Sequence, residues 1–247
     1  AFALNLIRTG ADNVVVGLNA MADLNSGDNA GASSQNVVIG SHAGGGAWAN
    51  TQTDGIVAIG YQAMDGALDN VDGTVAIGAQ ALGALTSGIG NLAIGQNAMV
   101  ANQTSDYNLA IGEGSLGALT LDGSANNLAI GHSAGLTLTV GASNILIGRN
   151  ALKLAALSES FNIAIGQDAM GAVDEGTNSG AGVNQADNNI AIGADALTGG
   201  DFGSSSDSTH RQLNSNIAIG TNALNSTSTN SQIGTIAIGH SALTALT

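Results

Sequence analysis

The stretch Asn91–Met99 reads NLAIGQNAM, and it decides the fold because the chain repeats it. Each block has an asparagine, three apolar residues, a glycine, two variable residues, an alanine and, in most copies, a leucine or methionine. The twelve block glycines are Gly17, Gly40, Gly60, Gly78, Gly95, Gly112, Gly131, Gly148, Gly166, Gly193, Gly220 and Gly239. Self-similarity at a short period is typical of solenoids. We therefore interpret residues 1–247 as a single repeat array.

The spacing of the glycines sets the size of the repeating unit. Most intervals are 17 to 20 residues and two are 27, which is the length of one solenoid coil and too short for a domain. Asparagine precedes the glycine by four residues in nine copies, and alanine follows it by three in eleven. The motif positions in three representative blocks are Asn91, Ile94, Gly95, Ala98, Asn162, Ile165, Gly166, Ala169, Asn189, Ile192, Gly193 and Ala196.

Each block is predicted to form a short strand, a glycine bend and a second apolar patch. Isoleucine and valine favour strands, and the Asn, Asp, Ser and Gly clusters between blocks are typical of turns. We expect an all-β, parallel β-solenoid of about 13 short coils. A helical turn in one connector, residues 151–158 (ALKLAALS), remains an alternative because its residues have good helix propensity.

The strand segments are apolar at three consecutive positions, as in Val75, Ala76 and Ile77. Successive strand side chains point to opposite faces, so apolar residues must lie on both faces. The small alanine suits a narrow interior. The outward pair would form an exposed apolar stripe unless another chain covers it, which predicts self-association.

Composition excludes several functions. Four Lys and Arg against 18 Asp and Glu give a formal charge of -14, which disfavours nucleic acid and anionic lipid as partners. Without cysteine the chain has no disulfide and no thiolate metal site. No apolar run approaches the roughly 18 residues that a membrane span needs, so no membrane insertion is expected.

We expect no catalytic, cofactor-binding or metal-binding residues. The histidines at 42, 132, 210 and 240 are read as exposed polar positions, and His132 and His240 lie too many coils apart to ligate one ion. The carboxylates are dispersed among the connectors, where turn chemistry accounts for them and weak calcium binding is the alternative. No nucleophile elbow or phosphate-binding loop is present.

Two long connectors are the predicted recognition loops. The insertions at 171–188 and 198–215 are adjacent in the array, and insertions in solenoids map to loops on one face. The candidate ligand-loop residues are Asp201, Phe202, Asp207, His210, Arg211 and, in an earlier connector, Trp48. Trp48 is the only large ring for which exposure is expected; packing of this ring over the early coils is preferred to a ligand contact.

The blocks NLAIGQNAM (Asn91–Met99), NIAIGQDAM (Asn162–Met170) and NIAIGADAL (Asn189–Leu197) resemble the head repeats of trimeric autotransporter adhesins and the similar repeats of bacteriophage tail fibres. The resemblance implies a left-handed parallel β-roll, three chains around a common axis, and attachment to a host surface. The coil is a few residues longer than the usual adhesin head repeat, which favours the phage-fibre or free-filament versions.

The expected function is structural and adhesive, in an extracellular fibre at a cell surface or on a virion. The expected partners are further copies of the chain, as a homotrimer or an end-to-end filament, and a host surface protein or glycan. The filament alternative follows from end coils that carry no charged or amphipathic cap, because uncapped solenoid ends can stack. A polysaccharide-acting β-helical enzyme is a third reading and would require clustered carboxylates in a groove.

Overall fold

The computed structural model describes residues 10–22, 32–48, 52–154, 159–173, 186–199, 212–226 and 231–244. The chain divides into two compact units, Ala1–Ala125 and Asn126–Thr247. Each unit is a parallel β-solenoid, and no α-helix occurs among the described residues. The predicted all-β solenoid class is therefore confirmed. The connector at 151–158 forms a turn over residues 151–154, and its remaining residues lie outside the described ranges.

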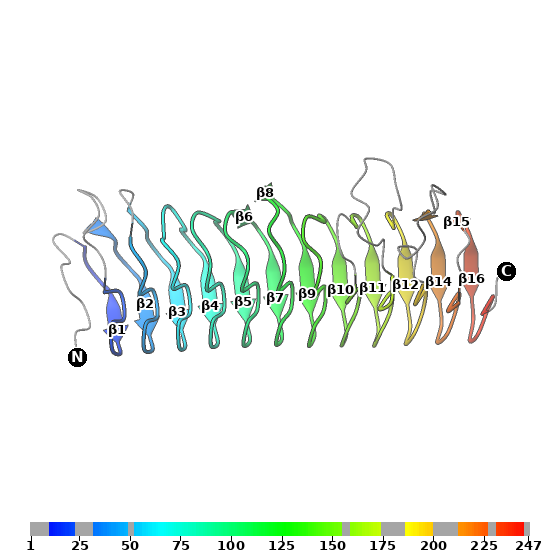
Figure 1. Ribbon diagram of the computed structural model, residues 1–247, viewed down its shortest axis with the longest axis horizontal. Helices are drawn as coiled ribbons and strands as arrows, with labels where there is room; N and C mark the ends of the chain where they lie inside the picture. The colour runs from blue at the N-terminus through cyan, green and yellow to red at the C-terminus, as the bar shows by residue number, and fades with distance from the viewer. Residues whose placement is uncertain are drawn as a thin grey trace, which may run out of the picture. The chain divides into compact units, whose positions relative to one another are not determined.

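Six three-residue strands lie side by side in chain order in the first unit (Figure 1). They are β1 (Val14–Val16), β2 (Val37–Ile39), β3 (Val57–Ile59), β4 (Val75–Ile77), β5 (Leu92–Ile94) and β7 (Leu109–Ile111). Equivalent residues of neighbouring blocks pair in parallel, so that Ala76 lies between Ala58 and Ala93. Two connector strands, β6 (Ser105–Asp106) and β8 (Gly123–Ser124), form a second parallel pair.

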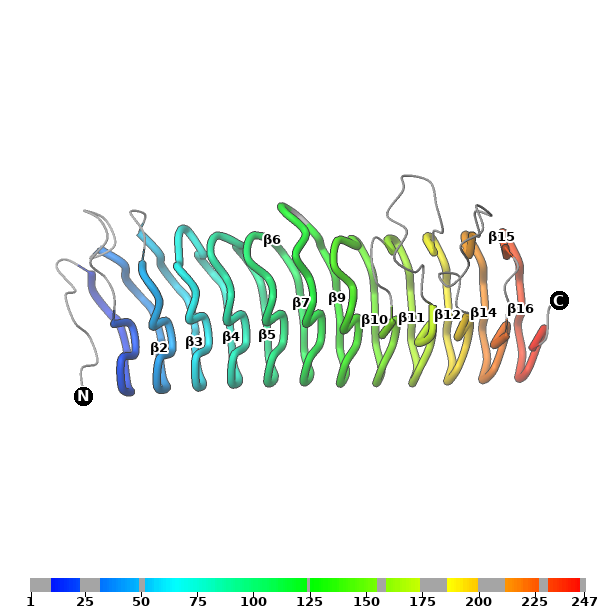
Figure 2. The backbone as a smooth tube through the Cα atoms, viewed as in Figure 1, coloured from blue at the N-terminus to red at the C-terminus, as the bar shows by residue number. Residues whose placement is uncertain are grey.

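The second unit repeats this arrangement. Its motif strands are β9 (Leu128–Ile130), β10 (Ile145–Ile147), β11 (Ile163–Ile165), β12 (Ile190–Ile192), β14 (Ile217–Ile219) and β16 (Ile236–Ile238). Two connector strands, β13 (Leu213–Asn214) and β15 (Gln232–Ile233), pair in parallel. Within each unit the backbone returns to the same position after every block (Figure 2). Each described motif strand thus begins one coil. The predicted total of about 13 coils also counts residues 1–9, which lie outside the described ranges.

Alanine is the commonest residue at the buried middle position of the motif strands, although Val38 in β2 and Leu146 in β10 are also fully buried there. In β11 the middle residue, Ala164, is fully buried, and the flanking Ile163 and Ile165 are half-buried on the outer side. The alanine that follows the bend, Ala169, is also fully buried. Alanine at both positions allows the two walls of the coil to approach closely, which explains why the motif repeats it.

The motif glycine is required by the close approach of neighbouring coils. Gly166 has a φ of 138°, and a Cβ on it would lie 2.4 Å from the carbonyl oxygen of Gly193 in the next coil. Such a separation is shorter than any normal van der Waals contact, so a side chain at this position would force the coils apart. A close contact with the next motif glycine occurs in ten of the twelve blocks and, together with the positive φ, accounts for the glycine there; a Cβ on Gly239 would meet nothing within 4 Å.

The bend after the glycine uses two residues in the left-handed region. Asp168 and Met170 have φ values of 54° and 53°, and Met170 is fully buried. Their main-chain N–H groups donate in opposite directions: Asp168 to the carbonyl of Arg149 in the preceding coil, and Met170 to the carbonyl of Ala196 in the next. The strained bend is therefore held by hydrogen bonds from both neighbours, and it turns the Ala-Met patch into the interior.

The motif asparagines form buried ladders. In the second unit the carboxamide oxygen of Asn144 accepts the main-chain N–H of Asn162 at 3.0 Å and its side-chain NH₂ at 3.2 Å. The Asn162 NH₂ also donates to the carbonyl of Ala186 at 2.7 Å, within its own coil. Asparagine is suited to this position because it offers an acceptor to one coil and donors to another, with no charge to bury.

Candidate functional site

The most extensive candidate surface is the outer face of the motif strands, which we call the outer stripe. It consists of the first and third residues of each described motif strand, and all of them are valine, leucine or isoleucine. Every one is half-buried or exposed in the single chain; Ile145 and Ile192, for example, are 38% and 36% exposed. The predicted outward apolar stripe is thus present within each unit.

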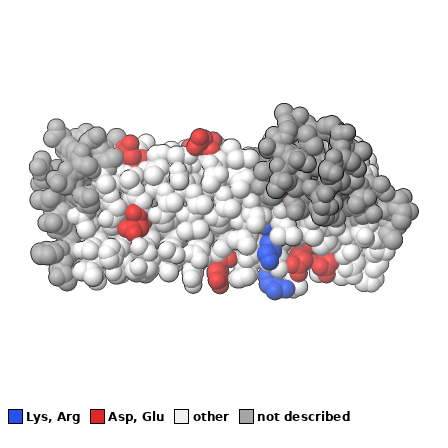
Figure 3. Space-filling view, in the orientation of Figure 1, with Lys and Arg blue, Asp and Glu red and all other residues white. Residues whose placement is uncertain are grey.

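Charged side chains are sparse on one face of the described residues (Figure 3). Figure 3 shows the described charged side chains as isolated patches on a face that is otherwise uncharged. The two described basic residues, Arg149 and Lys153, lie in one block, and Arg149 approaches Asp168 at 3.8 Å. Burial acts to raise the pKa of Asp168, but hydrogen bonds from Asn150 and Gln167, with the nearby positive charges, lower it overall. This carboxylate therefore remains ionised and paired.

The predicted ligand loops fall largely outside the described residues. Asp201, Phe202, Asp207, His210 and Arg211 all lie there, as do residues 174–185 of the first insertion. Their role as ligand contacts stays a prediction.

Trp48 is 1% exposed, so the expectation that its ring faces solvent is wrong. Its indole N–H donates to the carbonyl of Gly44 at 2.8 Å, and a Cβ on Gly44 would lie 3.2 Å from the ring. Because Gly44 has no side chain, there is space for the indole ring to pack against its backbone. The preferred expectation, that Trp48 packs over the early coils and does not contact a ligand, agrees with this burial.

Among the described residues, three other aromatic rings are exposed. Tyr61 follows a motif glycine and is 55% exposed, while Tyr107 and Phe161 each precede a motif asparagine. Tyr107 lies over Gly90 of the preceding coil, where a Cβ would be 2.8 Å from its ring. These three rings were not predicted as contact residues, because the predicted ligand contacts were placed in the connectors and these rings lie beside the motif glycines and asparagines.

The described histidines do not form a site. His42 lies near Asn19 and Ser41, within hydrogen-bonding distance of both, and meets the Tyr61 ring edge-on at a centroid distance of 6.4 Å. His132 and His240 are exposed after the glycines that follow β9 and β16, five ladder steps apart, or about 24 Å. Within the described ranges no group of three His, Cys, Asp or Glu side chains could hold a metal ion.

Several carboxylates cap the main chain of the preceding coil. Asp54 and Asp72 both lie six residues before a motif glycine, although the sequence had indicated no spacing that relates the carboxylates. The N–H of Asp54 donates to a carboxylate oxygen of Asp72 at 2.7 Å, and Ser34 donates to Asp54 at 2.6 Å. Asp187 occupies the same position and accepts from Ser160 at 2.7 Å. Burial raises the pKa of Asp187, against the effect of this hydrogen bond.

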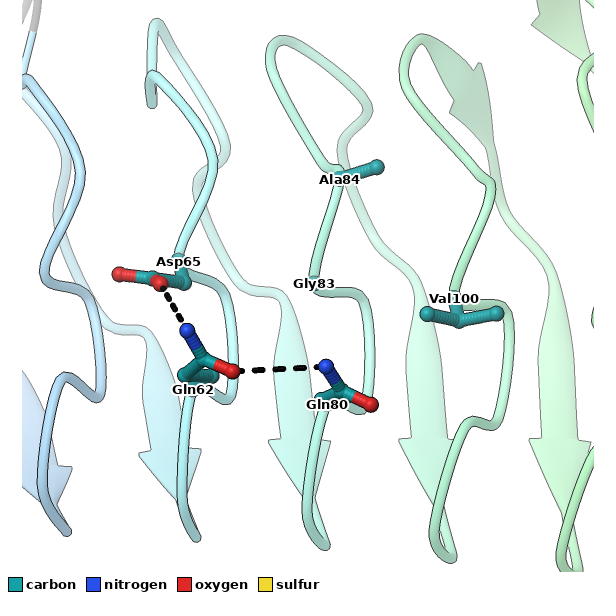
Figure 4. Close-up of a pocket in the computed structure, with 6 residues that line it drawn as sticks. All are labelled: Gln62, Asp65, Gln80, Gly83, Ala84 and Val100. Atoms are coloured by element: carbon teal, nitrogen blue, oxygen red, sulfur yellow. Dashed lines mark hydrogen bonds between the residues drawn. The ribbon is translucent and has the colours of Figure 1, made fainter.

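A polar hollow of about 180 Å³ lies in the first unit. Its lining residues are Gln62, Asp65, Gln80, Gly83, Ala84 and Val100 (Figure 4). The amide of Gln62 donates to Asp65 at 3.1 Å, and the amide of Gln80 donates to Gln62 at 3.4 Å. These residues were not among the predicted site residues, although glutamine recurs at the same block position in two successive repeats, at Gln62 and Gln80.

Comparison of the chain with protein families, with curated proteins and with solved structures finds no match. Among the described residues, no helix is long and apolar enough to cross a membrane. Two features of the described residues remain as candidate sites for association and binding: the outer stripe and the hollow.

Proposed function

We propose that the chain is a structural and adhesive segment of an extracellular fibre, at a cell surface or on a virion. In this proposal it is a rigid β-solenoid rod of about 13 coils, left-handed and homotrimeric, that displays the insertions 171–188 and 198–215 to a surface protein or glycan. It is not an enzyme. The observation that carries the proposal is the outer stripe, because an apolar surface that continues from strand to strand is unfavourable in water unless a partner covers it.

The structural part of the proposal is supported by how each coil holds the next. Main-chain pairing, asparagine ladders and glycine contacts all act between neighbouring coils, as in Asn162 with Asn189 and Gly166 with Gly193. The free energy of unfolding of such an array is close to a sum of contributions from neighbouring coils, so a longer array is held together equally along its length. A fibre that resists pulling and proteolysis needs this property.

The test of the trimer is the absolute mass of the purified chain by light scattering coupled to size exclusion. A discrete species at three times the monomer mass of 24.0 kDa is the expected result. A clean monomer over the whole accessible concentration range would overturn the proposed oligomer. Deleting the two insertions should leave the number of chains in the oligomer unchanged and abolish attachment to the surface partner.

An end-to-end filament is the second candidate, favoured by the register of the sheet. Each motif strand pairs with an equivalent strand, as Ile163–Ile165 does with Ile190–Ile192, so the two edges of a coil are complementary to each other. Contacts of this head-to-tail kind extend into filaments when they do not close. A broad, concentration-dependent series of masses above the trimer would favour the filament over the discrete trimer.

A further inference from the structure

The hollow in the first unit spans three successive coils. In Figure 4, Gln62 and Gln80 lie along one side, Asp65 and Val100 at the two flanks, and Ala84 on the opposite side. Gln62 and Asp65 are half-buried, so their polar groups are held in place while their outer atoms reach solvent. The hollow therefore has a polar side and an apolar side.

Two glycines create the space around Asp65. Gly45, Asp65 and Gly83 are each five residues past a motif glycine, so they are equivalent positions of neighbouring coils. A Cβ on Gly45 would lie 2.7 Å from a carboxylate oxygen of Asp65, and the Gly45 N–H donates to that carboxylate. Gly83 leaves the other flank open. The N–H of Gly45 thus positions the carboxylate of Asp65, and the absence of a side chain on Gly83 leaves that carboxylate accessible.

The polar groups form a connected array. Gln80 donates to Gln62, and Gln62 donates to Asp65, at 3.4 Å and 3.1 Å. Figure 4 shows the carboxamide oxygen of Gln80 turned away from Gln62, at the open end of this array. Each carboxamide has two donor hydrogens and an acceptor oxygen, so the array presents donors and acceptors together. Groups that both donate and accept, such as adjacent hydroxyls, match it best.

The size of the hollow limits its occupant. Its volume of about 180 Å³ equals the space of about six water molecules in the liquid. Pockets for drug-sized ligands are larger, at roughly 300–1,000 Å³. A single six-membered ring with its substituents is the appropriate scale, since its hydroxyls can take over the hydrogen bonds of the displaced waters.

We propose that the hollow is a subsite for one pyranose unit of a neutral glycan. Its adjacent hydroxyls bond Gln62, Gln80 and Asp65, and its C–H face lies over Ala84 and Val100. The proposal rests on the adhesive function for its biological setting, and it adds a contact surface outside the two insertions.

An ammonium group, such as a lysine side chain of a partner, fits the hollow less well. It offers only donors, so it could bond the carboxylate and carboxamide oxygens but not the second N–H of each carboxamide, whose first N–H donates within the array. Burial also raises the pKa of Asp65, against its contacts with Gln62, His42 and Gly45.

The test is saturation-transfer difference NMR on the full chain with the methyl glycosides of galactose, mannose and glucose, and with methylammonium as a separate probe. At least one glycoside should bind saturably, with a dissociation constant on the order of millimolar, as expected for a ligand of this size. Ala84→Leu fills the hollow and should weaken binding at least tenfold.

Ala118→Leu is the matched control, because Ala118 has the same position in a later block and is half-buried like Ala84 but does not line the hollow. It should leave binding unchanged. If Ala84→Leu fails to fold by circular dichroism, Asp65→Ala serves instead and should weaken binding similarly.

Absence of saturable binding by all three glycosides overturns the subsite, as does glycoside binding that both replacements leave unchanged. Saturable binding of methylammonium without glycoside binding also overturns it, in favour of a cationic partner. The outcome is independent of the mass measurement: a monomer that binds a glycoside retains the subsite and rejects the trimeric fibre.

Discussion

Asn162 and Asn189 in neighbouring coils are joined twice through one oxygen. The carboxamide oxygen of Asn162 accepts the main-chain N–H of Asn189 at 3.0 Å and its side-chain NH₂ at 3.1 Å. Both side chains are fully buried. The motif asparagine thus links one coil to the next at a buried position, and the first three of the five predictions below concern contacts between neighbouring coils.

Replacing Asn162 with alanine should destabilise the second unit by about 3 kcal/mol or more. The change removes the hydrogen bonds of the Asn162 side chain to the carbonyl of Ala186 and the main-chain N–H of Asn189, and each buried group left unsatisfied costs about 1–3 kcal/mol. The measurement is the free energy of unfolding in denaturant. Gln167→Ala is the control at an exposed position of the same block, and equal stabilities of the two variants would contradict the ladder's role.

Gly166→Ala should be far more damaging than Gly239→Ala. A Cβ at Gly166 would be 2.4 Å from the carbonyl oxygen of Gly193, whereas a Cβ at Gly239 meets no described atom within 4 Å. Both changes carry the cost of a positive φ, about 1–3 kcal/mol, so their difference isolates the contact between coils. Thermal melting of the two variants measures it. Equal melting temperatures would mean that the backbone conformation alone requires glycine.

Asp187→Asn should stabilise the protein at neutral pH. Burial raises the pKa of Asp187 in the folded state, so the charged form destabilises the fold above that pKa and the penalty disappears as the carboxyl protonates at lower pH. Asparagine can keep the acceptor for Ser160, since Asn214 fills the equivalent position and accepts the N–H of Asp187 at 2.9 Å.

The check on Asp187 is a series of melting curves between pH 7 and pH 3. The variant should melt above the natural chain at pH 7, and the gap should close as the pH falls. A gap that is constant across the series would show that the effect comes from the hydrogen bond and not from the charge.

A charge in the outer stripe should prevent self-association without unfolding the chain. Ile59→Glu places a carboxylate at a half-buried outward position of β3, where it can reach water in the monomer but would be buried between chains. Light scattering should then give the monomer mass of 24.0 kDa.

The control for Ile59 is its inward neighbour. Ala58→Glu buries a carboxylate in the coil and should unfold this region, which circular dichroism detects. If Ile59→Glu has the same mass as the natural chain, the stripe around β3 does not form the interface.

Trp48 is the only tryptophan of the chain, so its fluorescence reports one site. Emission should be blue-shifted and iodide should quench it poorly, because the ring is 1% exposed. Trp48→Ala should cost about 3–5 kcal/mol through the cavity and the lost bond to Gly44. A red-shifted, readily quenched spectrum would instead restore Trp48 as an exposed contact residue.

The sequence alone determined the fold class, the coil length and the outer stripe. These features follow from local chemistry that repeats: three apolar residues alternate between inside and outside, and a block such as Asn162–Met170 contains its own strand and bend. Repetition removes the usual ambiguity of pairing, because the favoured partner of a strand is its own copy in the next block.

The tertiary structure alone decided which side chains meet across coils. Three features depend on contacts between residues about one coil apart, whose alignment is fixed only once the connectors are folded. They are the close approach of Gly166 and Gly193, the hydrogen bond from the N–H of Asp54 to Asp72, and the hollow beside Asp65. Trp48 illustrates the same limit, since its burial depends on the missing side chain of Gly44. Local propensity specifies each coil, whereas stacking the coils creates the surfaces available for binding.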